Sequence, residues 1–500
     1  MRLSFVARHS LSRHSCESGS ALQQRKLVNP ASLPLTRVHD ASHWVPAFAG
    51  MTAKRAAKST AKSAQALLVG AALFMAGNAF AQNSTPSPVQ SVLIRNATVH
   101  TATSSGTLQA ADVLVRDGRI AAVGPGLSAG NARVVDAQGK PVTPALFGGI
   151  TGIGIEEVSG EDRTTDNALA LGAGDKDMVV RPEFDVTLAY NPDSVLVPVA
   201  RVEGIGFTLL GAGSSAGGSI IGGQGAVVRL DGNPDPLGPR VLFVQLGSDG
   251  ANLTGSSRAA QWMLLDQLID EMRGRIAPDS RMALLTPAGR ETLARYIDGG
   301  GRVMVGVDRA ADIRQLLRWS KRHGVRIAIA GGAEAWKLAP QLAAARVPVF
   351  VDPLANLPSD FDHIGASMEN AARLHAAGVE VAFTQSGDAS HNARKIRQLA
   401  GNAVANGLPW ADGLAGLTRV PAQALGVGDR VGTIAPGMVA DLVLWSGDPL
   451  EVGSVAQQVW LGGTAIPMRS RQTELRDRYL APQSSPESGD LPRAYPAAVR

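Results

Sequence analysis

The sequence predicts an α/β protein that combines a (β/α)₈ TIM-like barrel with a small β-sandwich built from both ends of the predicted mature chain. Two patterns predict this fold. Between residues 143 and 430, strand-like and helix-like segments alternate with short connections, which is typical of parallel βα units. On both sides of this region, at 92–142 and 431–470, lie short β segments of matching kind. A stretch of about 290 residues is long enough for a closed barrel.

The β segments at the two ends are short apolar runs separated by tight turns. The first group is predicted at 92–99, 111–115 and 120–123, with Asp117-Gly118 as the hairpin turn. The second group is predicted at 440–445, 459–461 and 464–466, with a Gly462-Gly463 turn. Residues 471–500 are charged and rich in Pro, so they are predicted to form a loosely attached tail.

Within the barrel region, β-branched runs alternate with amphipathic segments. The predicted strands are 302–307, 325–330, 347–351 and 379–384, and the predicted helices are 310–323, 333–345, 368–377 and 391–406. Right-handed connections between such units place the carboxyl ends of the strands at one end of the barrel. Candidate functional residues are therefore sought just after the strands.

The overall charge does not point to a nucleic-acid partner. The chain has 500 residues, 45% hydrophobic and 18% charged, with a net charge of +5. Residues 1–81 carry ten Lys or Arg side chains and only two acidic ones, so the remainder has a net charge of −3. The basic character belongs to the leading segment, and no basic-aromatic patch supports nucleic-acid binding.

The leading segment is typical of an export signal. Residues 51–81 contain a basic stretch, an apolar run at 66–77 and the small-x-small pattern Ala79-Phe80-Ala81, and are predicted to be a signal peptide. Twelve helical residues span only about 18 Å, too short for the ~30 Å bilayer core, so no stable membrane span is expected after cleavage. Residues 1–50 are interpreted as an extension upstream of the true start at Met51, and 82–91 as a linker. The mature protein is expected in the periplasm or outside the cell, without cysteine.

Four segments carry a resemblance to a known family. Residues 94–99, 111–124 and 135–140 resemble the opening of the amidohydrolase superfamily, and 432–443 resemble its closing strand. The imidazolonepropionase-like branch is the most similar, and the resemblance covers about 92–466. It implies a hydrolase acting on non-peptide C–N bonds of amides or cyclic amides, with zinc as the expected metal. These end motifs concern the fold rather than the chemistry.

The usual metal-binding histidines of that family are not found at the matching positions. The His-x-His pair that ends the first barrel strand falls on Ile150 and Gly152, and neither side chain can bind a metal. Gly306 and the glycine pair at 331–332 take two further histidine positions, and the usual Asp falls near Gln385. Of the five histidines after residue 81, only His391 lies just past a barrel strand. No metal ligand is therefore assigned, and the zinc ligands are not found.

Polar residues at the predicted strand ends are the remaining candidates. Asp388 and His391 form a possible acid/base pair, and Asp308 and Glu334 are possible oxygen ligands for a cation. Candidate binding residues are Gln385, Ser390, Asn392 and Glu157. The alternative is helix capping, because Asp308 precedes the helix at 310 and Asp388 with Ser390 precedes the one at 391.

Residues 213–217 match the G-x-S-x-G pattern of serine hydrolases, but no helix follows. The glycine-broken β pattern at 219–228 instead predicts a flexible loop or hairpin over the barrel mouth. Two functions stay open: a hydrolase with an atypical or degenerate metal site, or a non-catalytic barrel that binds a small molecule or partner protein. A small-molecule ligand is expected in either case, and an oligomer is possible.

Overall fold

The computed structural model describes residues 91–169, 180–214, 218–355, 357–387 and 389–480. The predictions for the leader and for residues 481–500 lie outside these residues, as does Asp388. Within the described ranges, no helix is both long and apolar enough to cross a bilayer.

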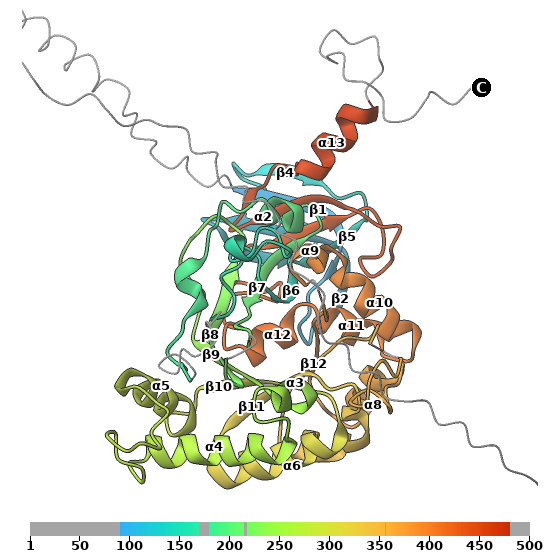
Figure 1. Ribbon diagram of the computed structural model, residues 1–500. Helices are drawn as coiled ribbons and strands as arrows, with labels where there is room; N and C mark the ends of the chain where they lie inside the picture. Colours follow the sequence, from blue (N-terminus) through green and yellow to red (C-terminus); the bar gives the residue numbers. More distant parts are fainter. Residues whose placement is uncertain (1–90, 170–179, 215–217, 356, 388, 481–500) are drawn as a thin grey trace, which may run out of the picture. The chain divides into compact units, whose positions relative to one another are not determined.

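An eight-stranded barrel sheet forms the centre of the described chain (Figure 1). Its strands follow one another in chain order around the sheet: β6 (Leu146–Thr151), β7 (Ile205–Leu210), β8 (Ile221–Arg229), β9 (Arg240–Gln245), β10 (Arg302–Val307), β11 (Arg326–Gly331), β12 (Val349–Val351) and β13 (Val381–Phe383). The strands are almost continuously buried, as expected for strands covered on both faces. The predicted α/β class with a TIM-like barrel is confirmed.

Backbone hydrogen bonds bring the two edge strands of this sheet to a common segment. Phe383 N, on β13, donates to Gly416 O, and Phe147 N, on β6, donates to Leu417 O. Ile150 N also donates to Thr384 Oγ1 at 3.2 Å. The barrel is therefore nearly closed. The contacts between its two edge strands run through residues 416–417 and the Thr384 side chain, and not through direct pairing of β6 with β13.

Strand β8 departs from the all-parallel pattern, because it runs antiparallel to both β7 and β9. The connection from β7 to β8 is too short for the crossover of a dozen or more residues that a parallel pair needs. Gly225 allows close contact with the end of β7, since a Cβ atom there would lie 1.9 Å from Leu210 O. The prediction of a flexible loop or hairpin over the barrel mouth at 219–228 is wrong, because most of these residues form β8, a buried strand of the barrel wall.

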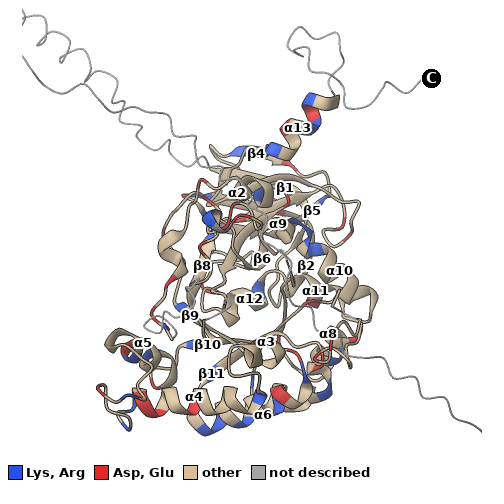
Figure 2. Ribbon diagram, viewed as in Figure 1, with Lys and Arg blue, Asp and Glu red and all other residues tan. Residues whose placement is uncertain are grey.

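Helices pack against the barrel sheet, and the four helical segments that the sequence predicted have bounds close to the observed ones. They are α2 (Leu196–Arg201), α3 (Gly247–Asn252), α4 (Arg258–Met272), α5 (Pro287–Ile297), α6 (Ala310–His323), α7 (Ala339–Ala344), α8 (Asn370–Ala376), α10 (Ile396–Ala405), α11 (Trp410–Ala415) and α12 (Arg419–Ala424), with short turns η5 (Ala335–Leu338), α9 (Ala389–Asn392) and η6 (Ala393–Lys395). Helix α6 buries Ile313, Leu316 and Trp319 against the sheet and ends at left-handed Gly324. Its outer face and that of α4 carry both signs of charge (Figure 2).

Aromatic side chains fill the barrel interior. Phe147 lies with its ring centroid 5.3 Å from that of Phe207 and 6.0 Å from that of Phe350, and all three are fully buried. The interior is thus a packed core, as in other barrels of this size, and space for a ligand remains only at its ends.

The strands from the two ends of the chain form a second eight-stranded sheet. It contains β1 (Val92–His100), β2 (Thr107–Arg116), β3 (Arg119–Gly124), β4 (Arg133–Asp136), β5 (Pro141–Pro144), β14 (Leu442–Trp445), β15 (Ala456–Leu461) and β16 (Thr464–Ala465). The decisive pairing is antiparallel, between β14 and β5, with Val443 opposite Thr143. Helix α13 (Arg471–Leu480) follows and buries none of its side chains.

Candidate functional site

A cavity of about 570 Å³ lies at the carboxyl ends of the barrel strands. This is the end at which (β/α)₈ barrels bind their ligands. Its polar lining comes from several strand ends and the loops after them: Thr151, Glu156, Ser159, Asn167, Gln245, Asp308, Asp352, Thr384, Gln385, Ser386 and Ser390. Ile150, Phe243 and Ala330 supply apolar surface.

Three glycines of the lining are covered by polar side chains from neighbouring positions. A Cβ atom on Gly152 would lie 2.7 Å from Glu156 Oε2, and one on Gly306 would lie 2.2 Å from Gln245 Oε1. On Gly331 it would lie 2.6 Å from Asp308 Oδ1. The space beside each glycine is therefore already occupied by an oxygen of the cavity wall.

Glu156 is held in the cavity by Ser390. Gly152 N donates to Ser390 Oγ at 2.9 Å, and Ser390 Oγ donates to Glu156 Oε2 at 2.7 Å. Both side chains are buried. Ser390 thus orients a carboxylate at the end of β6. The expectation that Ser390 caps the following helix is wrong, because it lies inside α9 and its hydroxyl is used in this chain.

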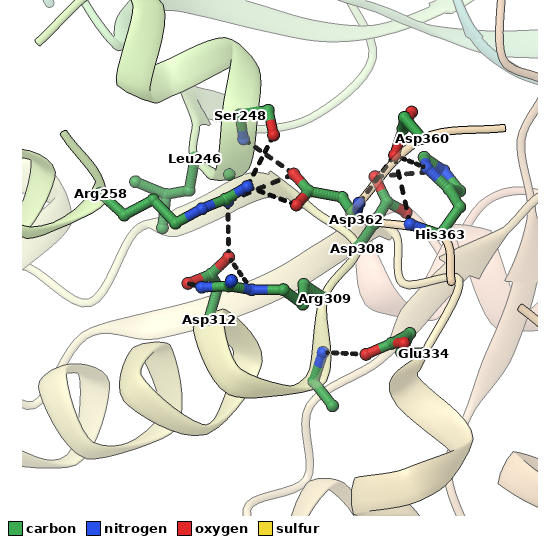
Figure 3. Close-up of polar contacts among 12 residues, drawn as sticks. Leu246, Ser248, Arg258, Asp308, Arg309, Asp312, Glu334, Asp360, Asp362 and His363 are labelled. Carbon is green, nitrogen blue, oxygen red and sulfur yellow. Dashed lines mark hydrogen bonds and ion pairs between the residues drawn. The ribbon is translucent and has the colours of Figure 1, made fainter. Parts of the chain in front are cut away.

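Asp308 reaches the cavity from the end of β10. Ala333 N donates to Asp308 Oδ1 at 3.1 Å, and His363 Nε2 lies 3.7 Å from Oδ2 (Figure 3). Burial raises the pKa of the Asp308 carboxyl above its ordinary value, against the opposing effects of the Ala333 N–H and of His363. A carboxyl of this kind can hold a proton and release it within the cavity.

His363 connects Asp308 to the protein surface. Its Nδ1 lies 2.8 Å from Oδ1 of the exposed Asp360. Burial by itself would lower the pKa of His363, but the hydrogen bond with Asp360 and the nearby charges of Asp308 and Asp362 raise it. Asp308, His363 and Asp360 thus form a row of titratable groups from the cavity to solvent.

Arg258 fixes the loop that carries this row (Figure 3). Its guanidinium donates to Asp312 Oδ2 at 2.9 Å and to Asp362 Oδ1 at 2.6 Å. Ser248 N also donates to Asp362 Oδ2 at 2.8 Å. The loop after β12 is therefore tied to α3 and α4 through the Asp362 carboxylate, and to α6 through Arg258 and Asp312.

Glu334 does not belong to the cavity. Ala310 N donates to its Oε2 at 2.9 Å, while Gly365 N and Lys337 Nζ each donate to Oε1 at 2.7 Å. Although burial would raise it, these hydrogen bonds hold the pKa of Glu334 below its ordinary value. Glu334, not Asp308, binds the amino terminus of α6, so the capping role predicted for Asp308 is wrong and a ligand role for Glu334 is not supported.

The other predicted residues divide between the cavity and its surroundings. Gln385 lines the cavity, and its buried Oε1 has no hydrogen-bond partner among the described residues. His391, Asn392 and Glu157 are not part of the described lining, and Asp388 lies outside the described residues. The acid/base pair of Asp388 and His391 therefore stays a prediction.

Sequence reasoning placed Glu156 and Asp352 at strand ends without choosing them as site candidates, and it did not identify Gln245. Glu156, rather than Glu157, faces the cavity. Asp352 accepts hydrogen bonds from Leu354 N and from Ser386 N, each at 2.9 Å, and so links β12 to the loop after β13. Gln245 ends β9, a strand that the sequence reading did not assign, and recognising that strand was the signal that could have found it.

The donor set does not fit the zinc that the family resemblance implies. In the part of the chain that the structure describes, no group of three or more His, Cys, Asp or Glu side chains could hold a metal ion. Ile150, Gly152, Gly306 and Gly331 all line the cavity without a ligating side chain.

Comparison with known proteins agrees with this architecture. The model of the family described as "Amidohydrolase family" matches residues 320–467. An amidohydrolase from Thermotoga maritima MSB8 has a similar structure, with a TM-score of 0.66 and 26% identity, over 76% of this chain and 100% of that one. The chain belongs to the amidohydrolase superfamily. Amidohydrolase tasK of Hapsidospora irregularis is 45% identical over 74 residues, which are 15% of this chain and 8% of tasK.

The contact between Gly306 and Gln245 in the cavity can be tested directly by substitution. Gly306→Ala should displace Gln245 Oε1 and weaken ligand binding at least about tenfold, while the free energy of unfolding falls by no more than ~1 kcal/mol because a flexible side chain gives way. Gly160→Ala is the control, because a Cβ atom there would meet nothing within 4 Å. Equal binding by both variants, measured by calorimetry, would show that Gln245 is not part of the site.

Proposed function

We propose that this protein is a small-molecule hydrolase of non-peptide C–N bonds, in amides or cyclic amides, which works with a degenerate, metal-poor site. The observation that carries the proposal is the position of Asp308, a carboxyl with a raised pKa, in a cavity at the ligand-binding end of the barrel. Family membership and the solved neighbour support the hydrolase class. The narrower similarity to imidazolonepropionases stays a prediction.

Asp308 and Glu156 would share the proton transfers of such a reaction. Protonated Asp308 would give its proton to the departing nitrogen as the C–N bond breaks, and the proton returns to it from solvent through His363. Glu156, oriented by Ser390, would accept a proton from the water that attacks the carbonyl carbon and would release it to solvent before the next turnover. The water supplies the new C–O bond, so no other reactant is needed.

A second candidate function is non-catalytic binding of a small molecule at the same cavity. The occupied space beside Gly152, Gly306 and Gly331 favours it, because a histidine at any of these positions would displace Glu156, Gln245 or Asp308. The barrel mouth would then be a binding site whose wall presents the oxygen acceptors of Glu156, Gln245 and Asp308 to the ligand.

Turnover of an amide and cyclic-amide panel by chelator-treated protein distinguishes the two functions. Asp308→Asn should lower kcat by about 10²–10⁴-fold. In the wild type, the activity that needs protonated Asp308 should persist above the ordinary Asp pKa and fall as the pH rises through the raised value. Binding without any turnover would support the second function.

The fold of Asp308→Asn should remain intact. The folded state holds the Asp308 proton more tightly than the unfolded chain does, so the ionised carboxylate costs stability above the ordinary Asp pKa. The variant should therefore match or exceed the wild-type unfolding midpoint. Asp266→Asn, in an exposed ion pair on α4, is the matched control and should keep full activity.

Export to the periplasm or beyond is also proposed, on the signal-like pattern at 51–81. Sequencing the amino terminus of protein recovered outside the cytoplasm should give Gln82. A terminus before Met51 would contradict both the signal and the predicted start.

A further inference from the structure

The described lining of the barrel-mouth cavity carries acidic groups without basic ones. It contains three carboxyl side chains, Glu156, Asp308 and Asp352, and no Lys, Arg or His. Two arginines lie nearby, but both pair with carboxylates outside the lining. Arg258 donates to Asp312 and Asp362, and Arg309 donates to Asp312. They therefore do not offset the charge that faces the cavity.

Amide side chains of the lining also present acceptors. Gln245 uses its Nε2 to donate to Leu246 O at 3.0 Å, and its Oε1 covers Gly306. Gln385 Oε1 is buried without a hydrogen-bond partner among the described residues. A buried acceptor without a donor is destabilising, and a ligand N–H that donates to it would remove this cost.

His363 offsets only one of the three carboxyls. It lies 3.7 Å from Asp308 and 2.8 Å from Asp360, outside the lining, with Asp362 as a further charged neighbour. Glu156 accepts from the neutral hydroxyl of Ser390, and Asp352 from backbone N–H groups and the Ser386 hydroxyl. Phe243 adds an aromatic ring to the same wall, which can also attract a cation.

We propose that the cavity selects small ligands that carry a positively charged, N–H-rich group, such as an amidinium, guanidinium or ammonium. Carboxylates and amide oxygens would accept the ligand's N–H groups in charge-assisted hydrogen bonds, and an anionic ligand would meet three carboxyls and no cation among the described lining residues. The inference rests on the proposed function, since it names the substrate class of that site.

Charge selectivity has a defined pH dependence. Protonation of Asp308 removes one of the charges that attract the ligand, so affinity for a cation should fall as the pH is lowered. The raised pKa of Asp308 makes this loss begin above the ordinary Asp range. Protonation of His363, which faces Asp308 together with Asp360, acts in the same direction.

Benzamidine, benzamide and benzoate test the proposal, because they have almost the same shape and carry a positive, no and a negative charge. Calorimetry with the full chain at pH 8 and low salt should show benzamidine binding at least about tenfold more tightly than benzamide, with no binding of benzoate. Glu156→Gln should weaken benzamidine about five- to tenfold and change benzamide less than about twofold. Glu369→Gln, in an exposed ion pair on the outer surface, should change neither.

If benzamidine binds no more tightly than benzamide, the charge preference is overturned, although the cavity would still be an amide site. Failure of both to bind would also overturn it, and turnover of the amide panel would then decide the proposed function separately. Equal losses for both ligands in Glu156→Gln would show that this residue shapes the cavity without selecting charge. A thermal melt of each variant confirms that the comparison is between folded proteins.

Discussion

Replacing Arg258 with methionine is expected to lower the free energy of unfolding by about 3 kcal/mol. The guanidinium binds Asp312 and Asp362, whose side chains are only 8% and 9% exposed. Without Arg258, two buried carboxylates lose their shared cation, and removal of one partner from a buried ion pair is strongly destabilising. Urea denaturation followed by circular dichroism measures the change.

Arg322→Met is the matched control, since Arg322 is 54% exposed and pairs with the exposed Asp266. Such surface pairs contribute about 0–1 kcal/mol. A loss in Arg258→Met no larger than in this control would contradict the proposed tether. The loop bearing His363 should also loosen, so the pH profile of ligand binding should change in Arg258→Met and not in Arg322→Met.

The second large effect is expected where the barrel meets the sheet formed by the chain ends. Asp441 accepts from Arg229 Nε at 3.0 Å, from Arg229 Nη2 at 2.6 Å and from Gly462 N at 2.7 Å. Its side chain is 4% exposed. Asp441→Asn removes the charge opposite Arg229 and places an N–H donor against other donors, so we expect a loss of about 3 kcal/mol.

Asp231→Asn provides the comparison, because Asp231 pairs with the same guanidinium but its side chain is 19% exposed. Its loss should be about 1 kcal/mol. Chemical denaturation of both variants measures the difference in their free energies of unfolding. Equal values would mean that Asp441 and Asp231 contribute equally to stability. Asp441 then would not be the residue that joins β8 to the sheet.

The elements of the barrel could be predicted where local patterns and packing agree. The helix predicted at 310–323 has those bounds, because its apolar residues recur at helical spacing and Gly324 ends it in a left-handed conformation. Strand β10 likewise matches the prediction for 302–307. The direction of β8 and its place in the wall could not be read in this way, since they depend on which neighbours the strand contacts.

The candidate site, unlike the barrel elements, could hardly be predicted from local sequence patterns. Asp308 and Glu334 both follow strands and looked equivalent in sequence, yet one faces the cavity and the other binds the amino terminus of α6. Glu156 and Glu157 are adjacent, and Ser390, more than 200 positions later, holds the one that faces the cavity. These outcomes depend on hydrogen bonds between distant segments, which no local pattern contains.

The amino-acid sequence was sufficient to predict the class of the fold and matching β segments at both ends, and it shows that Ile150, Gly152 and Gly306 have no ligating side chain. Hydrophobic periodicity and residue identity are local properties, so they can be read directly from the chain. The oxygens that occupy the space beside the glycines, and the carboxyls that share the cavity, were known only from the three-dimensional arrangement. The physical reason is that burial, charge and hydrogen bonding depend on residues brought together across the barrel, and these set the chemistry of the site.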